Sequence, residues 1–145
     1  MKFRFEYIRE EKWPPLAWLA ECAGSNPVIR VRHGSQVETR DVWFCEAIWD
    51  DEFTSGNFDR TDLVFGSGAR LRDVQVIFVS SGSTVDRLQF LELHGRTWIS
   101  NSIACLLAAS GVKADVSYER FPEFFRSIIG GIDAYERRLP TRDSG

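Results

Sequence analysis

Several features that would assign the chain to a membrane, to nucleic acid or to an export pathway are missing from its sequence. No apolar run among its 145 residues approaches the roughly 18–20 residues of a membrane-spanning helix. The net charge is −3, so no basic surface for nucleic acid is expected. The first residues, Met1 to Glu6, alternate charged with apolar side chains and do not form a signal peptide. We therefore expect neither a membrane nor a nucleic acid as a partner.

Cysteine is scarce as well, and its spacing excludes a disulfide framework. Cys22, Cys45 and Cys105 are odd in number, lie far apart and include no C-x-x-C pair. Free thiols of this kind are typical of the reducing cytoplasm. We therefore predict a cytoplasmic protein.

Apolar residues, by contrast, are abundant enough for a folded core. They make up 43% of the chain and include 11 phenylalanines, 5 tryptophans and 3 tyrosines. This composition excludes disorder over most of the length, and the length itself fits one domain. We predict a single domain over residues 1–139, followed by a polar tail over residues 140–145.

The first half of the chain mixes strand and helix patterns. Residues 3–8 alternate polar and apolar side chains and predict a strand. Two prolines precede residues 16–22, for which we predict a short helix. Residues 28–32 and 36–44 predict a hairpin, because β-branched residues alternate with polar ones on both sides of a turn. Residues 46–62 are rich in acidic residues and predict a loop with little core of its own.

The second half predicts strands followed by helices. Residues 74–80 are apolar enough for a central strand, and residues 88–93 and 97–100 predict a hairpin. A helix from Ile103 to a left-handed cap at Gly111 follows, and then a second helical region over residues 115–129. This order predicts an α+β fold, in which mostly antiparallel sheets are packed with helices.

Cys45 is the one candidate for a catalytic nucleophile. With His33 or His94 as a base and Asp41 to orient that base, it would form a thiol-hydrolase constellation. Its aromatic and aliphatic neighbours favour a buried structural cysteine instead. We therefore assign no catalytic residue, and keep Cys45, His33 and Asp41 as candidates.

Two further segments offer polar groups for a ligand. Glu46 and residues 50–52 carry carboxylates that would serve acid–base chemistry or a divalent cation, but such runs are usually only solvated. Residues 80–86 form a Ser/Gly-rich loop, which can cradle phosphate when a helix follows it. Here a strand follows, so we interpret the loop as a β-turn. We assign no metal ion and no cofactor.

A series of short motifs follows the Ser/Gly-rich loop. They are Asp86-Arg87-Leu88, a hairpin from Leu91 to Ser100, a Ser-x-Ser-x-x-x-Leu-Leu helix over residues 100–107, an Asp-led segment over residues 115–129, and Leu139-Pro140. The series resembles the closing half of the glutaminase domain in asparagine-synthetase-like proteins. The resemblance implies an N-terminal-nucleophile-hydrolase-like αββα sandwich, with two sheets between layers of helices.

The resemblance also implies that glutaminase chemistry is lost. In that family the nucleophile is the cysteine after the initiator methionine, and this chain has Lys2 there. The Asn-Gly pair that helps form the oxyanion hole in the family is missing too. We expect a catalytically inactive glutaminase-like domain that acts as scaffold. It would be either part of a longer amide-forming enzyme or a subunit that docks on an ATP-dependent synthetase-like partner.

Two other functions remain open at this point. One is a small cytoplasmic thiol hydrolase that uses Cys45. The other is a plain ligand-binding or oligomerising module, so that a homo-oligomer stays possible.

Overall fold

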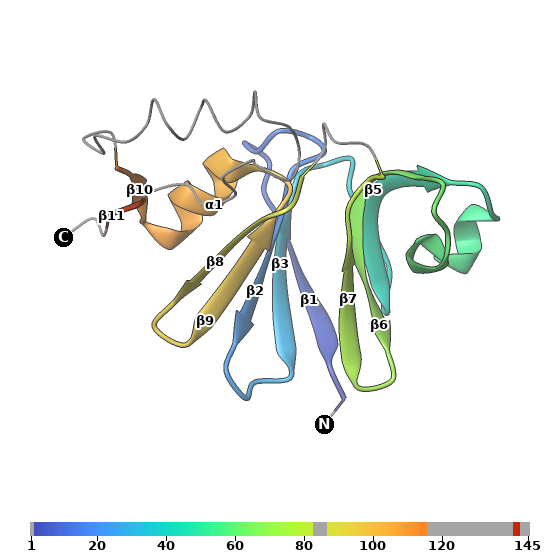
Figure 1. Ribbon diagram of the computed structural model, residues 1–145, viewed down its shortest axis with the longest axis horizontal. Coiled ribbons are helices and arrows are strands. Elements are labelled where there is room, and N and C mark those ends of the chain that lie inside the picture. The colour runs from blue at the N-terminus through green and yellow to red at the C-terminus, as the bar shows by residue number, and fades with distance from the viewer. Residues whose placement is uncertain (1, 83–86, 116–140, 143–145) are drawn as a thin grey trace, which may run out of the picture. The chain divides into compact units, whose positions relative to one another are not determined.

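The computed structural model describes residues 2–82, 87–115 and 141–142, and it divides the chain into two compact units, Met1–Leu106 and Leu107–Gly145. The first unit contains two β-sheets (Figure 1). In the second unit, β10 (Lys113–Ala114) pairs antiparallel with β11 (Thr141–Arg142). Most of the predicted second helix, at residues 115–129, lies outside the described residues.

The larger sheet, sheet A, has five strands in the order β1-β3-β2-β9-β8. Their bounds are Arg4–Arg9 (β1), Trp18–Ala23 (β2), Val28–His33 (β3), Gln89–Leu93 (β8) and Arg96–Ser100 (β9). β1 pairs parallel with β3, and every other pair in this sheet is antiparallel. β2 therefore lies at the centre of the sheet.

The smaller sheet, sheet B, has four antiparallel strands in the order β4-β5-β6-β7. Their bounds are Glu38–Thr39 (β4), Trp43–Trp49 (β5), Val64–Arg72 (β6) and Gln75–Val79 (β7). Two short 3₁₀ helices, η1 (Phe53–Ser55) and η2 (Phe58–Arg60), connect β5 to β6.

An aromatic core joins the two sheets. Trp18 of β2 is fully buried, and its ring lies 4.9 Å from that of Phe44 of β5 in an edge-on contact. Phe78 of β7 stacks on the same indole at 6.2 Å. Ile29, Val31, Val37 and Ala69 belong to the same buried cluster. Burial of each large side chain contributes about 1.5–3 kcal/mol, which makes this cluster the main source of stability. We call it the inner core.

The predicted α+β fold with packed helices, and with it the αββα sandwich, is wrong. Strands hold about half of the described residues, and one α-helix, α1 (Ile103–Ser110), occurs among them. Residues 16–22 were predicted as a helix and instead form most of β2. Trp18, Leu19 and Ala20 are all buried there, so both faces of this part of the strand are covered, because successive side chains point to opposite faces. A short apolar run of this kind does not distinguish a buried strand from a buried helix.

The predicted hairpin of residues 28–32 with 36–44 is also wrong. β3 pairs with β1 and β2, whereas the following segment enters sheet B. The chain crosses between the sheets at Gly34, whose amide donates to the carbonyl of Ala17. A Cβ at Gly34 would lie 2.1 Å from the carbonyl oxygen of Pro14, so this crossing requires glycine. The strand predicted as central, at residues 74–80, is the edge strand β7.

Three local predictions are confirmed. β1 covers the first predicted strand, and β8 and β9 form the predicted hairpin around a turn with positive φ at His94 and Gly95. α1 starts after Ser102, whose hydroxyl accepts a bond from the amide of Cys105, and it ends before Gly111 with φ of 74°. Within the described part of the chain, no helix is long and apolar enough to cross a membrane.

Candidate functional site

The thiol of Cys45 lies on the face of sheet B that points away from sheet A. The residue is only 1% exposed and packs with Trp43 and Phe58. Its Sγ lies 4.0 Å from the carbonyl oxygen of Ala47. Burial raises the pKa of this thiol to about 11, and nearby carboxylates add to the shift. The thiol is therefore protonated at neutral pH, whereas a nucleophilic cysteine needs a thiolate.

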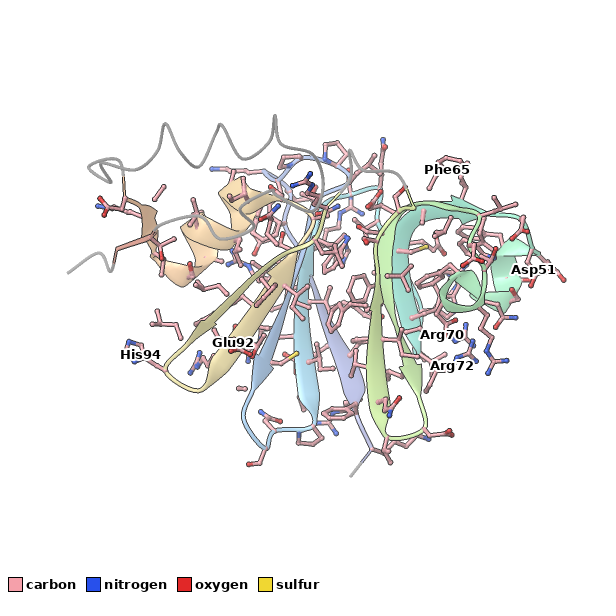
Figure 2. The ribbon with its side chains drawn as sticks, in the orientation of Figure 1. Asp51, Phe65, Arg70, Arg72, Glu92 and His94 are labelled. Carbon is pink, nitrogen blue, oxygen red and sulfur yellow. The ribbon has the colours of Figure 1, made fainter. Side chains whose placement is uncertain are left out.

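The other residues of the thiol constellation lie elsewhere. His33 ends β3 in sheet A, where Nδ1 lies 2.9 Å from the carbonyl oxygen of Gly34. Asp41 is exposed between β4 and β5, and His94 lies at the tip of the β8–β9 hairpin (Figure 2). Among the described residues, no hydrogen bond joins Cys45 to either histidine. The structure does not bring a base to this thiol.

The prediction of a loop with little core of its own over residues 46–62 is wrong, because β5 continues to Trp49 and residues 50–62 pack on an apolar cluster. Phe58 is fully buried, and its ring lies 5.3 Å from that of Trp49 and 6.0 Å from that of Trp43. Phe53 stacks on Trp49 at 5.0 Å. Trp43, Trp49 and Phe58, with Cys45 and Val64, form a second apolar cluster on the outer face of sheet B, and Phe53 packs at its edge. We call it the outer core.

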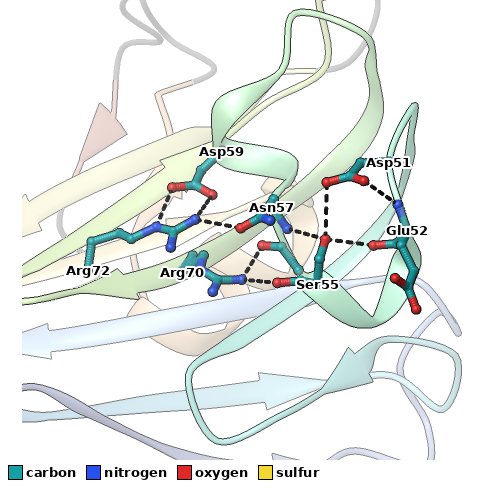
Figure 3. A network of polar contacts seen from close by, with 8 residues as sticks. Asp51, Glu52, Ser55, Asn57, Asp59, Arg70 and Arg72 are labelled. Atoms are coloured by element: carbon teal, nitrogen blue, oxygen red, sulfur yellow. Dashed lines mark hydrogen bonds and ion pairs between the residues drawn. The ribbon is translucent and has the colours of Figure 1, made fainter.

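Two arginines of β6 fasten this segment over the outer core (Figure 3). Arg72 donates from Nε and Nη2 to both carboxylate oxygens of Asp59, at 2.9 and 2.8 Å, and Nη2 also reaches Asn57 at 2.9 Å. Arg70 donates to the carbonyl oxygen of Ser55 at 2.7 Å and to that of Gly56. Burial acts to raise the pKa of Asp59, but Arg72 outweighs it and lowers that pKa below the ordinary 3.8.

The glycines of β6 make room for the outer core. Gly66 and Gly68 lie on the same face as Arg70 and Arg72, because strand residues alternate. A Cβ at Gly68 would lie 2.6 Å from the Cβ of Cys45. The pattern Gly-x-Gly-x-Arg-x-Arg is a signal in the sequence that points to this arrangement.

The acidic residues split into two groups. Glu46 points toward sheet A, where its Oε1 accepts bonds from Ser67 and from Asn101. The carboxylates of residues 50–52 stay in the exposed turn after β5 and accept bonds from Thr61, from the amide of residue 52 and from Thr54. No group of three or more His, Cys, Asp or Glu in the described part of the chain is arranged to hold a metal ion.

A polar network around Glu46 ties the two sheets together. The indole Nε1 of Trp18 donates to Ser67 Oγ at 3.0 Å, and Ser67 donates to Glu46. Asn101, which follows β9, reaches Glu46 at 3.3 Å and accepts a bond from the amide of Trp18 at 2.9 Å. The network borders a cavity of about 340 Å³, lined by Glu46, Ser67, Ser80, Arg87, Gln89, Asn101 and Ile103. Part of the Ser/Gly-rich loop, residues 83–86, lies outside the described residues.

A second cavity, which we call the β5 groove, has four large, partly exposed apolar side chains in its lining. Its volume is about 330 Å³, and it is lined by Leu16, Gln36, Glu38, Cys45, Glu46, Ala47, Ile48, Phe53 and Phe65. Ile48 and Phe65 are cross-strand partners in β5 and β6 and are 68% and 62% exposed. Leu16 and Phe53 are 50% and 41% exposed. Figure 2 shows Phe65 standing outward at the end of the strand. The register that pairs Ile48 with Phe65 was not predicted from the sequence.

Comparison of the chain with protein-family models, with curated protein sequences and with solved structures gives no match.

Proposed function

We propose that this chain is a non-catalytic docking domain for an ATP-dependent, amide-forming partner. The observation that carries the proposal is the β5 groove, where four large apolar side chains gather on the surface. Exposed apolar patches of this kind mark interaction surfaces in folded proteins. Covering the exposed two thirds of Ile48 and Phe65 would contribute about 1–2 kcal/mol each.

The choice of partner class rests on the resemblance of residues 86–140 to the glutaminase domain of asparagine-synthetase-like proteins. In that family the domain accompanies an ATP-dependent synthetase. Of the properties of that family, we propose only the docking role for this chain, and not the αββα sandwich. Lys2 replaces the family's nucleophile, which supports scaffolding rather than glutamine hydrolysis. The three free cysteines fit the reducing cytoplasm, where we place this function.

The test is affinity capture from native cytoplasmic extract with the tagged full chain, followed by mass spectrometry. We expect enrichment of an ATP-dependent amide-forming enzyme, and loss of that enrichment in the Ile48→Ser/Phe65→Ser double variant. Phe90→Ser is the matched control, because Phe90 is 74% exposed but lies on β8 of the other sheet. Capture of no amide-forming enzyme, or equal capture by the double variant, would contradict the proposal.

The alternative of a thiol hydrolase gains no support from the geometry around Cys45. Its thiol is buried, has a raised pKa and lacks a basic partner among the described residues. In a Cys22→Ser/Cys105→Ser background we expect iodoacetamide at neutral pH to label Cys45 slowly, at a rate limited by opening of the outer core. Rapid labelling of the folded protein would restore the alternative.

A further inference from the structure

The edge of β5 that faces the groove is only partly covered by a strand. β4 pairs with Phe44 and Cys45 alone, whereas β5 continues to Trp49 and pairs with β6 along its whole length. Within the described residues, no strand pairs with residues 47–49 on that edge. Backbone amides and carbonyls on such an edge are a template for another strand.

The β5 groove lies along this open edge. Gln36 and Glu38 border it from the β4 side, and Phe53 borders it beyond. An added strand would continue the position of β4, and its alternate side chains would reach Ile48 and Phe65 on one face. The volume of about 330 Å³ suits a few side chains of one segment rather than a broad surface.

The surroundings of the groove are acidic. Residues 46–62 hold six carboxylates and one arginine, and one of those carboxylates, Asp59, is paired with Arg72. Asp50, Asp51 and Glu52 follow directly after β5, are exposed, and form no ion pair within the described residues. Side chains of an incoming segment would therefore meet a negative potential at this end of the strand.

We propose that the β5 groove binds an extended basic segment of a partner protein, which adds to sheet B as a strand beside β5. The segment would alternate apolar anchors with lysine or arginine. The inference rests on the proposed docking function and specifies the chemistry of its partner. Backbone hydrogen bonds supply affinity in this binding mode, and alternate side chains supply specificity.

A second copy of this chain is a poor occupant of the same edge. A symmetric dimer places the same surface of both copies together. In an antiparallel pairing centred on Ile48, Glu46 of each copy would lie opposite Asp50 of the other, with Asp51 and Glu52 close by. Like charges at close range oppose such pairing, whereas a basic segment removes the conflict.

The test uses the full chain and three synthetic peptides, measured by fluorescence anisotropy. The first alternates leucine with lysine, the second has glutamate for each lysine, and the third is the first with N-methylated backbone amides at alternate positions. We expect the basic peptide to bind at least about tenfold more tightly than either control, and to weaken as salt screens the charges. We also expect slower hydrogen exchange at residues 47–49 when it is bound.

Variants of the chain locate the binding. The Ile48→Ser/Phe65→Ser double variant should lose at least about tenfold in affinity for the basic peptide. An Asp50→Asn/Asp51→Asn/Glu52→Gln variant should lose most of the salt dependence, and Phe90→Ser should bind as the unchanged chain does.

The possible results test strand addition separately from the proposed docking function. Absence of binding, equal affinity for the acidic peptide, or full affinity of the N-methylated peptide would each overturn strand addition. Affinity capture of an amide-forming enzyme would still support docking in those cases. Conversely, peptide binding with no such enzyme captured would leave the strand-addition site standing and overturn the choice of partner.

Discussion

The two faces of sheet B carry apolar cores that are held in different ways. The inner core brings together residues far apart in the sequence, such as Trp18 and Phe44, and strand pairing in both sheets fixes it. The outer core is covered by the single segment of residues 50–62, which two arginine side chains hold in place. The inner core therefore depends on global folding, whereas the outer core can open locally when its polar contacts fail.

Removal of the central indole should have the largest effect. We expect Trp18→Ala to lower the free energy of unfolding by about 3–5 kcal/mol, because it leaves a cavity between the sheets and leaves Ser67 without its donor. Urea unfolding would measure the loss. Trp13→Ala is the control, since the half-buried Trp13 lies outside the inner core, with the guanidinium of Arg32 4.8 Å from its ring, and its loss should cost about 0.5–1 kcal/mol. Equal losses in the two variants would contradict a central role for Trp18.

Release of the outer segment should have an intermediate effect. We expect Arg72→Ala to cost about 1.5–3 kcal/mol, because Asp59 is buried and loses a charged partner. Hydrogen exchange should accelerate in residues 50–62 and stay unchanged in β2 and β9. Arg9→Ala is the control, because its ion pair with Glu11 is exposed and its loss should cost about 1 kcal/mol or less. Faster exchange throughout both sheets would show that the outer core does not open on its own.

The smallest effect should be the loss of the Asp59–Arg72 contribution to the free energy of unfolding at acid pH. Since the folded-state pKa of Asp59 is below its ordinary 3.8, the Asp59–Arg72 pair stabilises the fold at neutral pH. That contribution is lost as the pH falls through the folded-state pKa. We therefore expect the gap in unfolding free energy between the unchanged chain and Asp59→Asn to shrink below pH 3.8. A constant gap from neutral pH into this acid range would refute the linkage.

Local features of the fold were predictable from the sequence where one segment determines them. Polar alternation identified β1, a positive-φ turn fixed the β8–β9 hairpin, and the cap at Ser102 with Gly111 delimited α1. β2 was mistaken for a helix, because burial on both faces removes the alternation that marks a strand. The crossing at Gly34 was missed, because it depends on a close approach to Pro14 from another part of the fold.

The candidate site was harder to predict than the fold. Cys45 was expected to be structural, and its burial and raised pKa agree with that interpretation. The β5 groove could not be predicted from the sequence, because Ile48 and Phe65 become neighbours only through the register of β5 with β6. The sequence predicts that the acidic residues after β5 are solvated. It does not predict that they lie beside an open strand edge, because that position depends on the short pairing of β4 with β5.

The alternation along β6 has a consequence for how sheet B assembles. Ser67, Ala69 and Leu71 face the inner core, whereas Arg70 and Arg72 face the outer segment. A slip of one residue against β5 would turn both guanidinium groups into an apolar interior and the aliphatic side chains toward solvent. Every slip by an odd number of residues is therefore strongly disfavoured for this strand, which removes half of the alignments open to β6 when sheet B assembles.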